Sequence, residues 1–271
     1  MKVEAKKKFG QNFISDQNLI NKIVSILGDD QDQLIIEIGP GTGALTKLLA
    51  RKYNKVVAIE IDTDMETILK KEVQSDNFEL FLSDVLLVDF EKLISEKRQH
   101  ENQKVSIISN MPYYITSEIL FRTLNVSDKL TKAVFMMQKE VAVRVCSNKG
   151  ENNYNNLSVA CEFFADKKYE FTVPKHMFYP VPKVDSAIIS LTFNNKYTEQ
   201  IKDKDKFLVF LRKIFNNRRK TILNNLSNVT NDKPKANEIL DSAGIDKSLR
   251  PEVIGLEDFI KIFLETFQKD V

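Results

Sequence analysis

Short runs of consecutive apolar residues recur along the first half of the chain, separated by segments with the spacing of amphipathic helices. Such runs are typical of strands that are buried on both faces of a sheet. The predicted strands cover residues 34–38, 56–59, 78–82, 107–110 and 133–137. The predicted helices run from the N-cap Asp16 to about residue 27, from residue 116 to about 124, and from residue 139 onward. This alternation predicts an α/β domain with an open sheet.

The pattern changes in the last third of the chain. Residues 169–173 and 187–193 predict a closing antiparallel pair of strands. From residue 203 onward, apolar positions return at helical spacing, and glycine and proline interrupt the later segments. We therefore predict two domains, one of residues 1–195 that contains the sheet and a small all-helical one of residues 196–271.

Composition narrows the class of protein. The chain has 271 residues, 42% of them hydrophobic, which is enough for a substantial core. It contains no apolar run of eighteen residues and no charged-then-apolar leader, so we expect a cytoplasmic protein without a membrane partner. Cys146, Cys161, His100 and His176 lack the spacing of metal ligands, and no metal site is predicted.

A glycine-rich loop follows the first buried strand. Gly39, Gly41 and Gly43 stand at alternate positions, which allows a tight turn and close approach of the backbone to a ligand. The next strand ends in Glu60, a carboxylate that can accept both hydroxyl groups of a ribose. Loop and carboxylate together indicate nucleoside binding, although Gly39, Gly41 and Ala44 also satisfy the dinucleotide fingerprint of dehydrogenases.

The next two strands end in polar residues that suit a methyltransferase. Asp84 follows residues 78–82 and could accept from a cofactor adenine, whereas Asn110-Met111-Pro112-Tyr113 closes the following strand. The N6 amine of adenine is a poor nucleophile, and acceptors such as the Asn110 oxygen and the Pro112 carbonyl would hold it as it becomes tetrahedral. Tyr113 could stack on the base, although an ordinary Asn-Xaa-Pro turn explains the tetrapeptide equally well. An S-adenosylmethionine methyltransferase uses all four strand ends, and a dehydrogenase uses two.

Two segments allow both a functional and a structural interpretation. Residues 9–14 could lie across a pocket as a lid or form a frayed terminus. Pro180 and Pro182 stiffen the loop of residues 177–186, which could present Phe178 or bury it as an aromatic plug.

Charge is distributed unevenly despite a net value of only +2. Residues 196–250 contain 13 Lys and Arg against 7 Asp and Glu, and the N-terminal arm is also basic. The two patches suggest a polyanionic partner, although a run of charge is often only a solvated face.

Several motifs, taken in order along nearly the whole chain, resemble the rRNA adenine N6,N6-dimethyltransferases. These motifs are residues 9–13, 37–43, 110–113, 138–142, 180–186 and 215–221. The basic residues after 217 and the stretch 243–250 resemble the bacterial small-subunit branch, which is linked to kasugamycin sensitivity. Resistance methyltransferases of the large subunit share only the first five motifs. Tyr114 departs from the family pattern, which usually has asparagine there.

The resemblance implies a class I, Rossmann-like methyltransferase sheet and gives individual residues a role. Contacts to the cofactor S-adenosylmethionine would come from Asn12, Ile14, Gly39, Gly41, Glu60, Asp84 and Asn110. The catalytic group around the target base would be Asn110, Pro112, Tyr113 and Phe178. RNA contacts are expected from Lys6, Lys7, Lys8, Arg218, Arg219 and Lys220.

The implied activity is dimethylation of two adjacent adenosines in the 3′-terminal hairpin of 16S rRNA, within the small ribosomal subunit or its precursor, by a monomer. Two alternatives stay open. One is a methyltransferase for large-subunit rRNA, and the other is a ribosome-assembly binding factor in which methylation is incidental. Intact glycines, Glu60, Asp84 and Asn110 favour the enzyme, because a pure binder does not need them.

Overall fold

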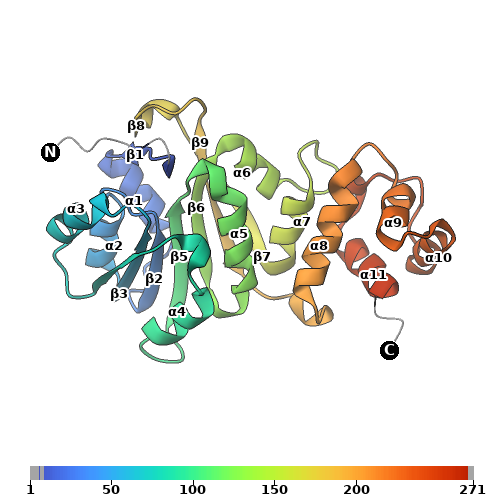
Figure 1. Ribbon diagram of the computed structural model, residues 1–271, viewed down its shortest axis with the longest axis horizontal. Helices are drawn as coiled ribbons and strands as arrows, with labels where there is room; N and C mark the ends of the chain where they lie inside the picture. Colours follow the sequence, from blue (N-terminus) through green and yellow to red (C-terminus); the bar gives the residue numbers. More distant parts are fainter. Residues whose placement is uncertain (1–5, 7–8, 268–271) are drawn as a thin grey trace. The chain divides into compact units, whose positions relative to one another are not determined.

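The computed structural model describes residues 6 and 9–267 of the protein. A central sheet of seven strands organises the first part of the chain. The strand order is β4-β3-β2-β5-β6-β9-β7 (Figure 1). The bounds are β2 (Gln33–Ile38), β3 (Lys55–Glu60), β4 (Phe78–Leu82), β5 (Lys104–Asn110), β6 (Lys132–Gln138), β7 (Ala165–Val173) and β9 (Ser186–Phe193). β2 to β6 pair in parallel, and β9 runs antiparallel to β6. The predicted α/β class is confirmed.

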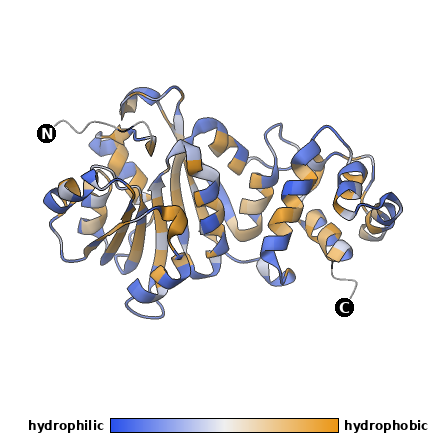
Figure 2. Cartoon of the chain, in the orientation of Figure 1, coloured by the Kyte–Doolittle hydropathy of each residue, from blue (hydrophilic) through white to orange (hydrophobic). Residues whose placement is uncertain are grey.

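The apolar runs form strands because the sheet encloses them on both faces. Every residue of β2 is buried, and Leu34, Ile35 and Ile36 are completely inaccessible. Figure 2 shows the hydrophobic residues concentrated along these strands. Removing such side chains from water contributes about 25 cal/mol per Å² of apolar area, which offsets the cost of ordering the chain.

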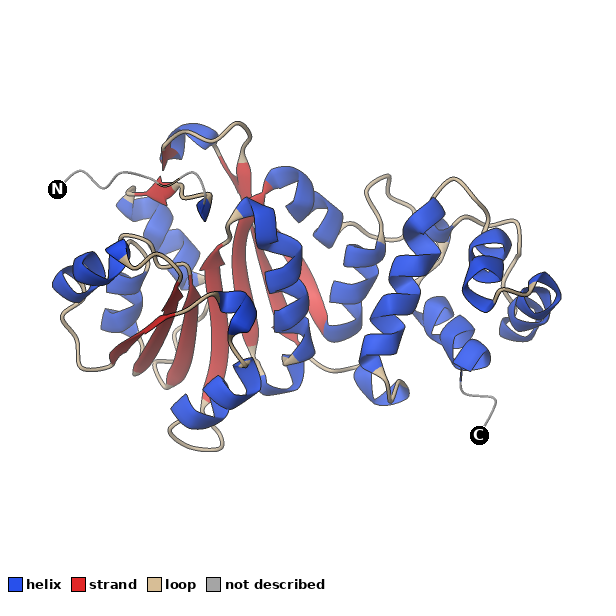
Figure 3. Cartoon of the chain, in the orientation of Figure 1, coloured by secondary structure: helices blue, strands red, loops and turns tan. Residues whose placement is uncertain are grey.

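Helices alternate with the parallel strands, as the sequence predicts (Figure 3). They are α1 (Gln17–Ser25), α2 (Thr46–Lys52), α3 (Asp64–Glu72), α4 (Phe90–Lys97), α5 (Thr116–Asn125) and α6 (Lys139–Cys146). The predicted N-cap of α1 is confirmed, since the Asp16 carboxylate accepts a hydrogen bond from the Leu19 amide at 2.7 Å.

The order of the strands determines where a ligand can bind. The chain moves outward from β2 through β3 to β4, and then returns to β5 on the other side of β2. In open α/β sheets, ligands bind at such a reversal, beyond the carboxyl ends of the strands. The glycine-rich loop after β2 and the Asn110 cluster after β5 lie at this point.

A second, two-stranded sheet joins the N-terminal arm to the proline-containing loop. β1 (Phe13–Ile14) pairs antiparallel with β8 (Phe178–Tyr179), so that Ile14 lies opposite Phe178. Two residues per strand give too little alternation for a sequence pattern to reveal, which explains why neither strand is predicted.

The compact units of the described chain differ from the predicted domains. Residues up to 142 and 168–193 form one unit, and residues 143–167 and those from 194 onward form the other. The second unit contains α7 (Asn156–Phe164), α8 (Lys204–Ile214), α9 (Ile222–Thr230), α10 (Lys233–Ala243) and α11 (Leu256–Phe267).

The boundary differs because α7 packs with the C-terminal helices. The rings of Phe163 on α7 and Phe207 on α8 are 4.8 Å apart, and Phe207 also contacts Phe263 on α11. The predicted division at residues 195 and 196 therefore assigns residues 143–167 to the wrong unit.

No helix in the described residues is long and apolar enough to cross a membrane.

Candidate active site

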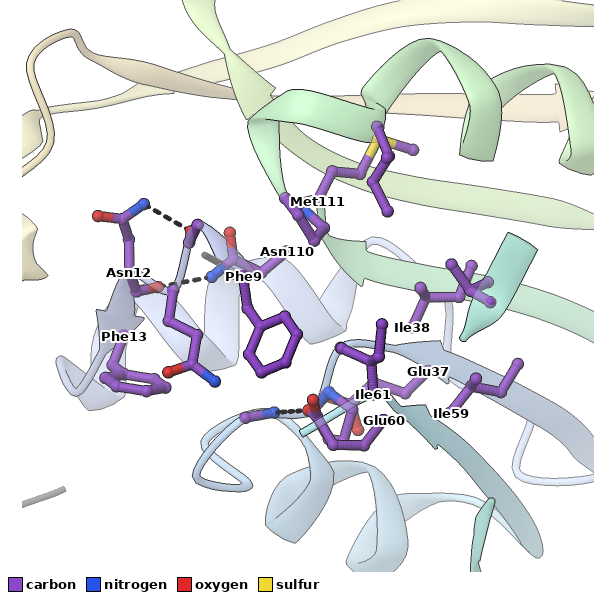
Figure 4. Close-up of a pocket in the computed structure, with 18 of the residues that line it drawn as sticks. Phe9, Asn12, Phe13, Glu37, Ile38, Ile59, Glu60, Ile61, Asn110 and Met111 are labelled. Atoms are coloured by element: carbon purple, nitrogen blue, oxygen red, sulfur yellow. Dashed lines mark hydrogen bonds between the residues drawn. The ribbon is translucent and has the colours of Figure 1, made fainter. Parts of the chain in front are cut away.

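A pocket of about 910 Å³, counting the open space at its mouth, lies at the carboxyl ends of the parallel strands. It is lined by the N-terminal arm, the loop after β2 and the ends of β3, β4 and β5 (Figure 4). Its position, beyond the carboxyl ends of the strands, is where open α/β sheets bind nucleoside-type ligands. The four predicted strand ends therefore meet around one cavity.

The glycine-rich loop shapes one wall of this pocket. Gly39 and Gly41 both adopt positive φ, at 70° and 53°, a region in which other residues are strained. A Cβ at Gly41 would lie 3.0 Å from the ring of Phe13, so a side chain there would push against the arm. The sequence predicts that a ligand approaches the backbone of this loop closely. The packing of Phe13 is a second reason for a residue without a side chain at position 41.

Glu60 stands at the tip of β3 with both carboxylate oxygens oriented. One oxygen accepts from the Gly41 amide at 3.1 Å and the other from the Asp62 amide at 2.8 Å. Burial raises the pKa of Glu60, and these two hydrogen bonds oppose the rise. Each carboxylate oxygen can still accept one more hydrogen bond, which is what the two hydroxyl groups of a ribose require.

Asp84 also lines the pocket, directly after β4. Its side chain accepts from the Leu86 amide at 2.9 Å and thereby caps the 3-10 turn Val85–Leu87. This contact holds the carboxylate at the wall while leaving further acceptor capacity for an exocyclic amine.

Asn110 has a defined orientation at the end of β5. Its amide nitrogen donates to the Asn12 carbonyl at 2.9 Å (Figure 4). Two oxygens would repel each other at this distance, so the amino side of the carboxamide must face Asn12 and the oxygen remains available as an acceptor. This is the acceptor that the sequence predicts at the reacting nitrogen.

Pro112 and Tyr113 are already engaged in local contacts. The Pro112 carbonyl accepts from the Ile115 amide and the Thr116 hydroxyl, both at 3.2 Å. The Tyr113 hydroxyl bonds to Ser186 at 2.8 Å, and its ring is half-buried outside the set of residues that line the pocket. Their predicted roles toward a target base stay predictions.

Tyr114, and not the preceding Tyr113, lines the pocket. Its side chain is 54% exposed, and its ring lies 3.5 Å from the position that a Cβ on Gly10 would occupy. Tyr114 departs from the family pattern and is not among the predicted site residues, yet the structure places it at the wall of the pocket.

The expectation that the proline-containing loop presents Phe178 is wrong for this structure. Phe178 is only 3% exposed and belongs to the hydrophobic core cluster, opposite Ile14 in the small sheet. Pairing of β8 with the arm turns the ring inward, so it has no free face for a base. The residue exposed on this strand is Tyr179, at 67%.

The N-terminal arm does lie along the pocket. Residues from Phe9 to Ile14 line it, and the side chain of Asn12 donates to the Gly10 carbonyl at 3.0 Å. Ile14 is buried at 5% exposure. The structure therefore favours the lid interpretation over a frayed terminus for the described part of the arm.

The basic residues predicted to contact RNA have different surroundings. The Lys6 ammonium pairs with Asp62 and Asp64, so its charge is already compensated and does not form the free basic arm that was expected. Lys7 and Lys8 lie outside the described residues. Arg218, Arg219 and Lys220 are exposed in the second unit, where Arg218 donates to the Asn152 carbonyl at 2.8 Å.

One buried carboxyl group at the pocket, that of Glu37, is not among the predicted site residues. Glu37 is 1% exposed and lines the pocket, and among the described residues its Oε2 atom has no hydrogen-bond partner. Burial raises the pKa of Glu37 to about 8. A single carboxylate inside an otherwise apolar strand is the sequence signal that could have identified it.

Together these side chains fit S-adenosylmethionine. The pocket wall combines the side chains of Glu60 and Asp84, which can accept from the ribose hydroxyls and from the adenine amino group of that cofactor. Among the described residues, no group of three or more His, Cys, Asp or Glu side chains could hold a metal ion.

Known proteins resemble this chain over nearly its whole length. The ribosomal RNA small subunit methyltransferase A of Mesoplasma florum is 92% identical over 98% of this chain and 100% of that protein. The protein of the same name from Mycoplasma capricolum is 60% identical over 96% of this chain and 97% of that protein. The crystal structure of a dimethyladenosine transferase from Plasmodium falciparum is 25% identical, with a TM-score of 0.80, and the match covers 96% of this chain and 98% of that one.

The model of the family described as ribosomal RNA adenine dimethylase matches residues 2–266. The resemblance noted from the motifs is thereby confirmed. Since the match spans almost the whole chain, this protein belongs to the ribosomal RNA adenine dimethylase family.

Proposed function

We propose that the protein uses S-adenosylmethionine to dimethylate the N6 atoms of two adjacent adenosines in the 3′-terminal hairpin of 16S rRNA. The observation that carries this proposal is the oriented carboxamide of Asn110, whose amino side is occupied by the Asn12 carbonyl. Asn110 lines a pocket that also contains Glu60 and Asp84. The small-subunit name of the relatives supports this rRNA as the substrate.

The cofactor is held by residues from four elements. Glu60 accepts from the ribose hydroxyls and Asp84 from the adenine amino group, while Asn12, Ile14, Gly39 and Gly41 enclose the remainder. When bound, S-adenosylmethionine supplies an electrophilic methyl group on a sulfonium. The carboxyl groups of the pocket wall favour this positive charge.

Catalysis depends on acceptors rather than on a strong base. The Asn110 oxygen holds the adenine amine while its lone pair turns toward the methyl group, and the Pro112 carbonyl can receive the second N–H once it leaves its contacts of 3.2 Å. The methylated nitrogen then carries an acidic proton that water can take. Tyr113, positioned by Ser186, offers its ring to the base, which must leave its stack to reach the pocket.

The RNA partner is a small ribosomal subunit or its precursor, bound by one copy of the chain. The exposed Arg218, Arg219 and Lys220 supply phosphate contacts that position the hairpin. The described arm contributes less charge than its composition suggests, because Lys6 is paired.

Mass spectrometry of 16S rRNA tests the proposal. Small subunits from a strain that lacks the modification should gain dimethyladenosine at two adjacent 3′-terminal positions when incubated with the protein and S-adenosylmethionine. Asn110→Ala should lower the rate by about 10²–10³, the usual cost of losing one preorganised hydrogen bond in catalysis. Asp29→Asn, which removes an exposed carboxylate outside the pocket, is the matched control.

Other results would separate the alternatives. Methylation of large-subunit rRNA alone would contradict the substrate assignment. Tight binding to small subunits with no methyl transfer by the wild type would favour an assembly factor. Wild-type rates for Asn110→Ala would remove Asn110 from the mechanism while leaving the substrate open.

A further inference from the structure

Asp62 joins the N-terminal arm to the turn that follows β3. Its carboxylate is 1% exposed, and it accepts hydrogen bonds from Lys6 Nζ at 2.6 Å and from Gln11 Nε2 at 2.8 Å. Both donors belong to the arm, more than fifty positions away along the sequence. Burial opposes ionisation of Asp62, but the bonds from Lys6 and Gln11 outweigh it and lower the pKa of the carboxyl group. The Asp62 carboxylate is therefore charged, and each of its two oxygens accepts a hydrogen bond from the arm.

The same turn orients the carboxylate predicted to bind ribose. The backbone amide of Asp62 donates to Glu60 at 2.8 Å, while its side chain holds the arm. One residue therefore contacts the cofactor-binding wall through its backbone and the cover of the pocket through its side chain.

The arm has a second, apolar anchor at its other end. β1 pairs with β8, Ile14 and Phe178 are buried against the core, and the Asn12 carbonyl accepts from Asn110. Gly10 lies between Lys6 and Gln11, the two residues that bond to Asp62, and its φ of 60° is a conformation that glycine adopts without strain. The polar anchor at Asp62 involves the half-exposed Lys6 side chain and can exchange its partners for water more easily than the apolar anchor can.

The described part of the arm forms one side of the pocket. Phe9, Gln11 and Phe13 line the pocket, and the ring of Phe13 packs on Gly41. Segments that cover a bound cofactor commonly determine how fast it leaves, because release requires them to open.

We propose that Asp62 is a positioning residue that latches the N-terminal arm over the pocket and so sets the residence time of the cofactor. The proposal rests on the proposed function, since it takes S-adenosylmethionine as the ligand. Asp62 itself touches neither the reacting atoms nor the target base. Its effect is on how long the arm stays closed.

The test measures release of sinefungin, the unreactive analogue of S-adenosylmethionine, and of S-adenosylhomocysteine from the full chain by stopped-flow displacement. Asp62→Asn and Lys6→Ala should each raise the dissociation rate constant about tenfold, which corresponds to a loss of about 1.4 kcal/mol. With small subunits as substrate, KM for the cofactor should rise while kcat at saturation stays near that of the wild type. Hydrogen exchange at the amides of residues 9–14 should become faster.

The control is Asp29→Asn, because Asp29 also pairs with a lysine but is 99% exposed and outside the arm. Lys6→Ala decides the matter if Asp62→Asn fails to fold, since it removes one of the two donors that the arm contributes and replaces a side chain that is not buried. Unchanged release and unchanged exchange in residues 9–14 would overturn the latch alone. Failure of the wild type to bind either probe would instead overturn the proposed function.

Discussion

Two polar side chains at the pocket differ in how their hydrogen-bonding capacity is used. Asn110 has its amino side satisfied by Asn12, and its free oxygen is directed by that contact. Glu37 is buried with one oxygen unpartnered, a state in which the neutral acid is favoured over the carboxylate. The oriented amide of Asn110 can therefore contribute to chemistry. Glu37, by contrast, would lower the stability of the protein if it became charged without a partner.

Glu37 should make the stability of the protein depend on pH. Its folded pKa of about 8 lies above the ordinary value of 4.5, so the folded state binds a proton that the unfolded state has lost. The favourable contribution is complete below the unfolded pKa and is lost as pH rises toward the folded pKa. Glu37→Gln keeps the size and the neutral charge, and it should be more stable than the wild type at pH 8 by on the order of a few kcal/mol.

Urea denaturation of both proteins between pH 5 and 9 measures this effect. The two stabilities should converge toward pH 5, where Glu37 is protonated. Glu60 is also buried but is present in both proteins, so the difference between the two curves isolates Glu37. Parallel curves across the whole range would contradict the raised pKa.

At the scale of elements, the pairing of β1 with β8 changes the role of the proline-containing loop. The pairing buries Phe178 in the core and leaves Tyr179 pointing to solvent on the same short strand. Alternate residues of a strand face opposite sides, so the register of a two-residue strand decides which aromatic ring is available.

Phe178→Ala should therefore act first on stability. Truncating a buried phenylalanine typically costs about 3–5 kcal/mol, and the arm that packs on it should loosen as well. Tyr179→Ala is the matched control on the same strand and should change stability by less than about 0.5 kcal/mol, because its ring is exposed.

Thermal and urea unfolding of the two variants separate packing from substrate binding. An unchanged unfolding midpoint for Phe178→Ala, together with loss of RNA methylation and normal cofactor binding, would return Phe178 to the predicted base-stacking role.

At the scale of the whole molecule, cofactor and RNA are expected to depend on different units. The pocket is built entirely from residues of the first unit, whereas Arg218, Arg219 and Lys220 belong to the second. Changes to the basic cluster should therefore leave cofactor affinity intact.

Replacing Arg218, Arg219 and Lys220 with glutamine should weaken binding to small subunits and reduce its dependence on salt. Each lost phosphate contact should lower the slope of log affinity against log salt by about 0.7–0.9 through reduced counterion release. Binding at several salt concentrations gives this slope. Lys202, Lys233 and Lys235, exposed lysines in the same unit, form the control triple variant. Equal slopes for the wild type and the Arg218 triple variant would assign the cluster to an ordinary solvated face.

Local sequence patterns were enough to predict the sheet and the polar groups at its strand ends. Residues 34–38 form a strand because a run that is apolar except for Glu37 is stable only between two covered faces, and Glu60, Asp84 and Asn110 follow directly from where such runs stop. These are local properties. They place Gly39, Glu60, Asp84 and Asn110 at one edge once the strands run parallel.

Contacts between groups that are far apart in the sequence became known from the folded chain alone. Asn110 is oriented by a residue 98 positions earlier, and Lys6 pairs with Asp62 across 56 positions. Phe178 is buried by the arm, and α7 joins the second unit through Phe163 and Phe207. No local pattern encodes these contacts, because each depends on which surfaces remain uncovered after the sheet and helices have formed.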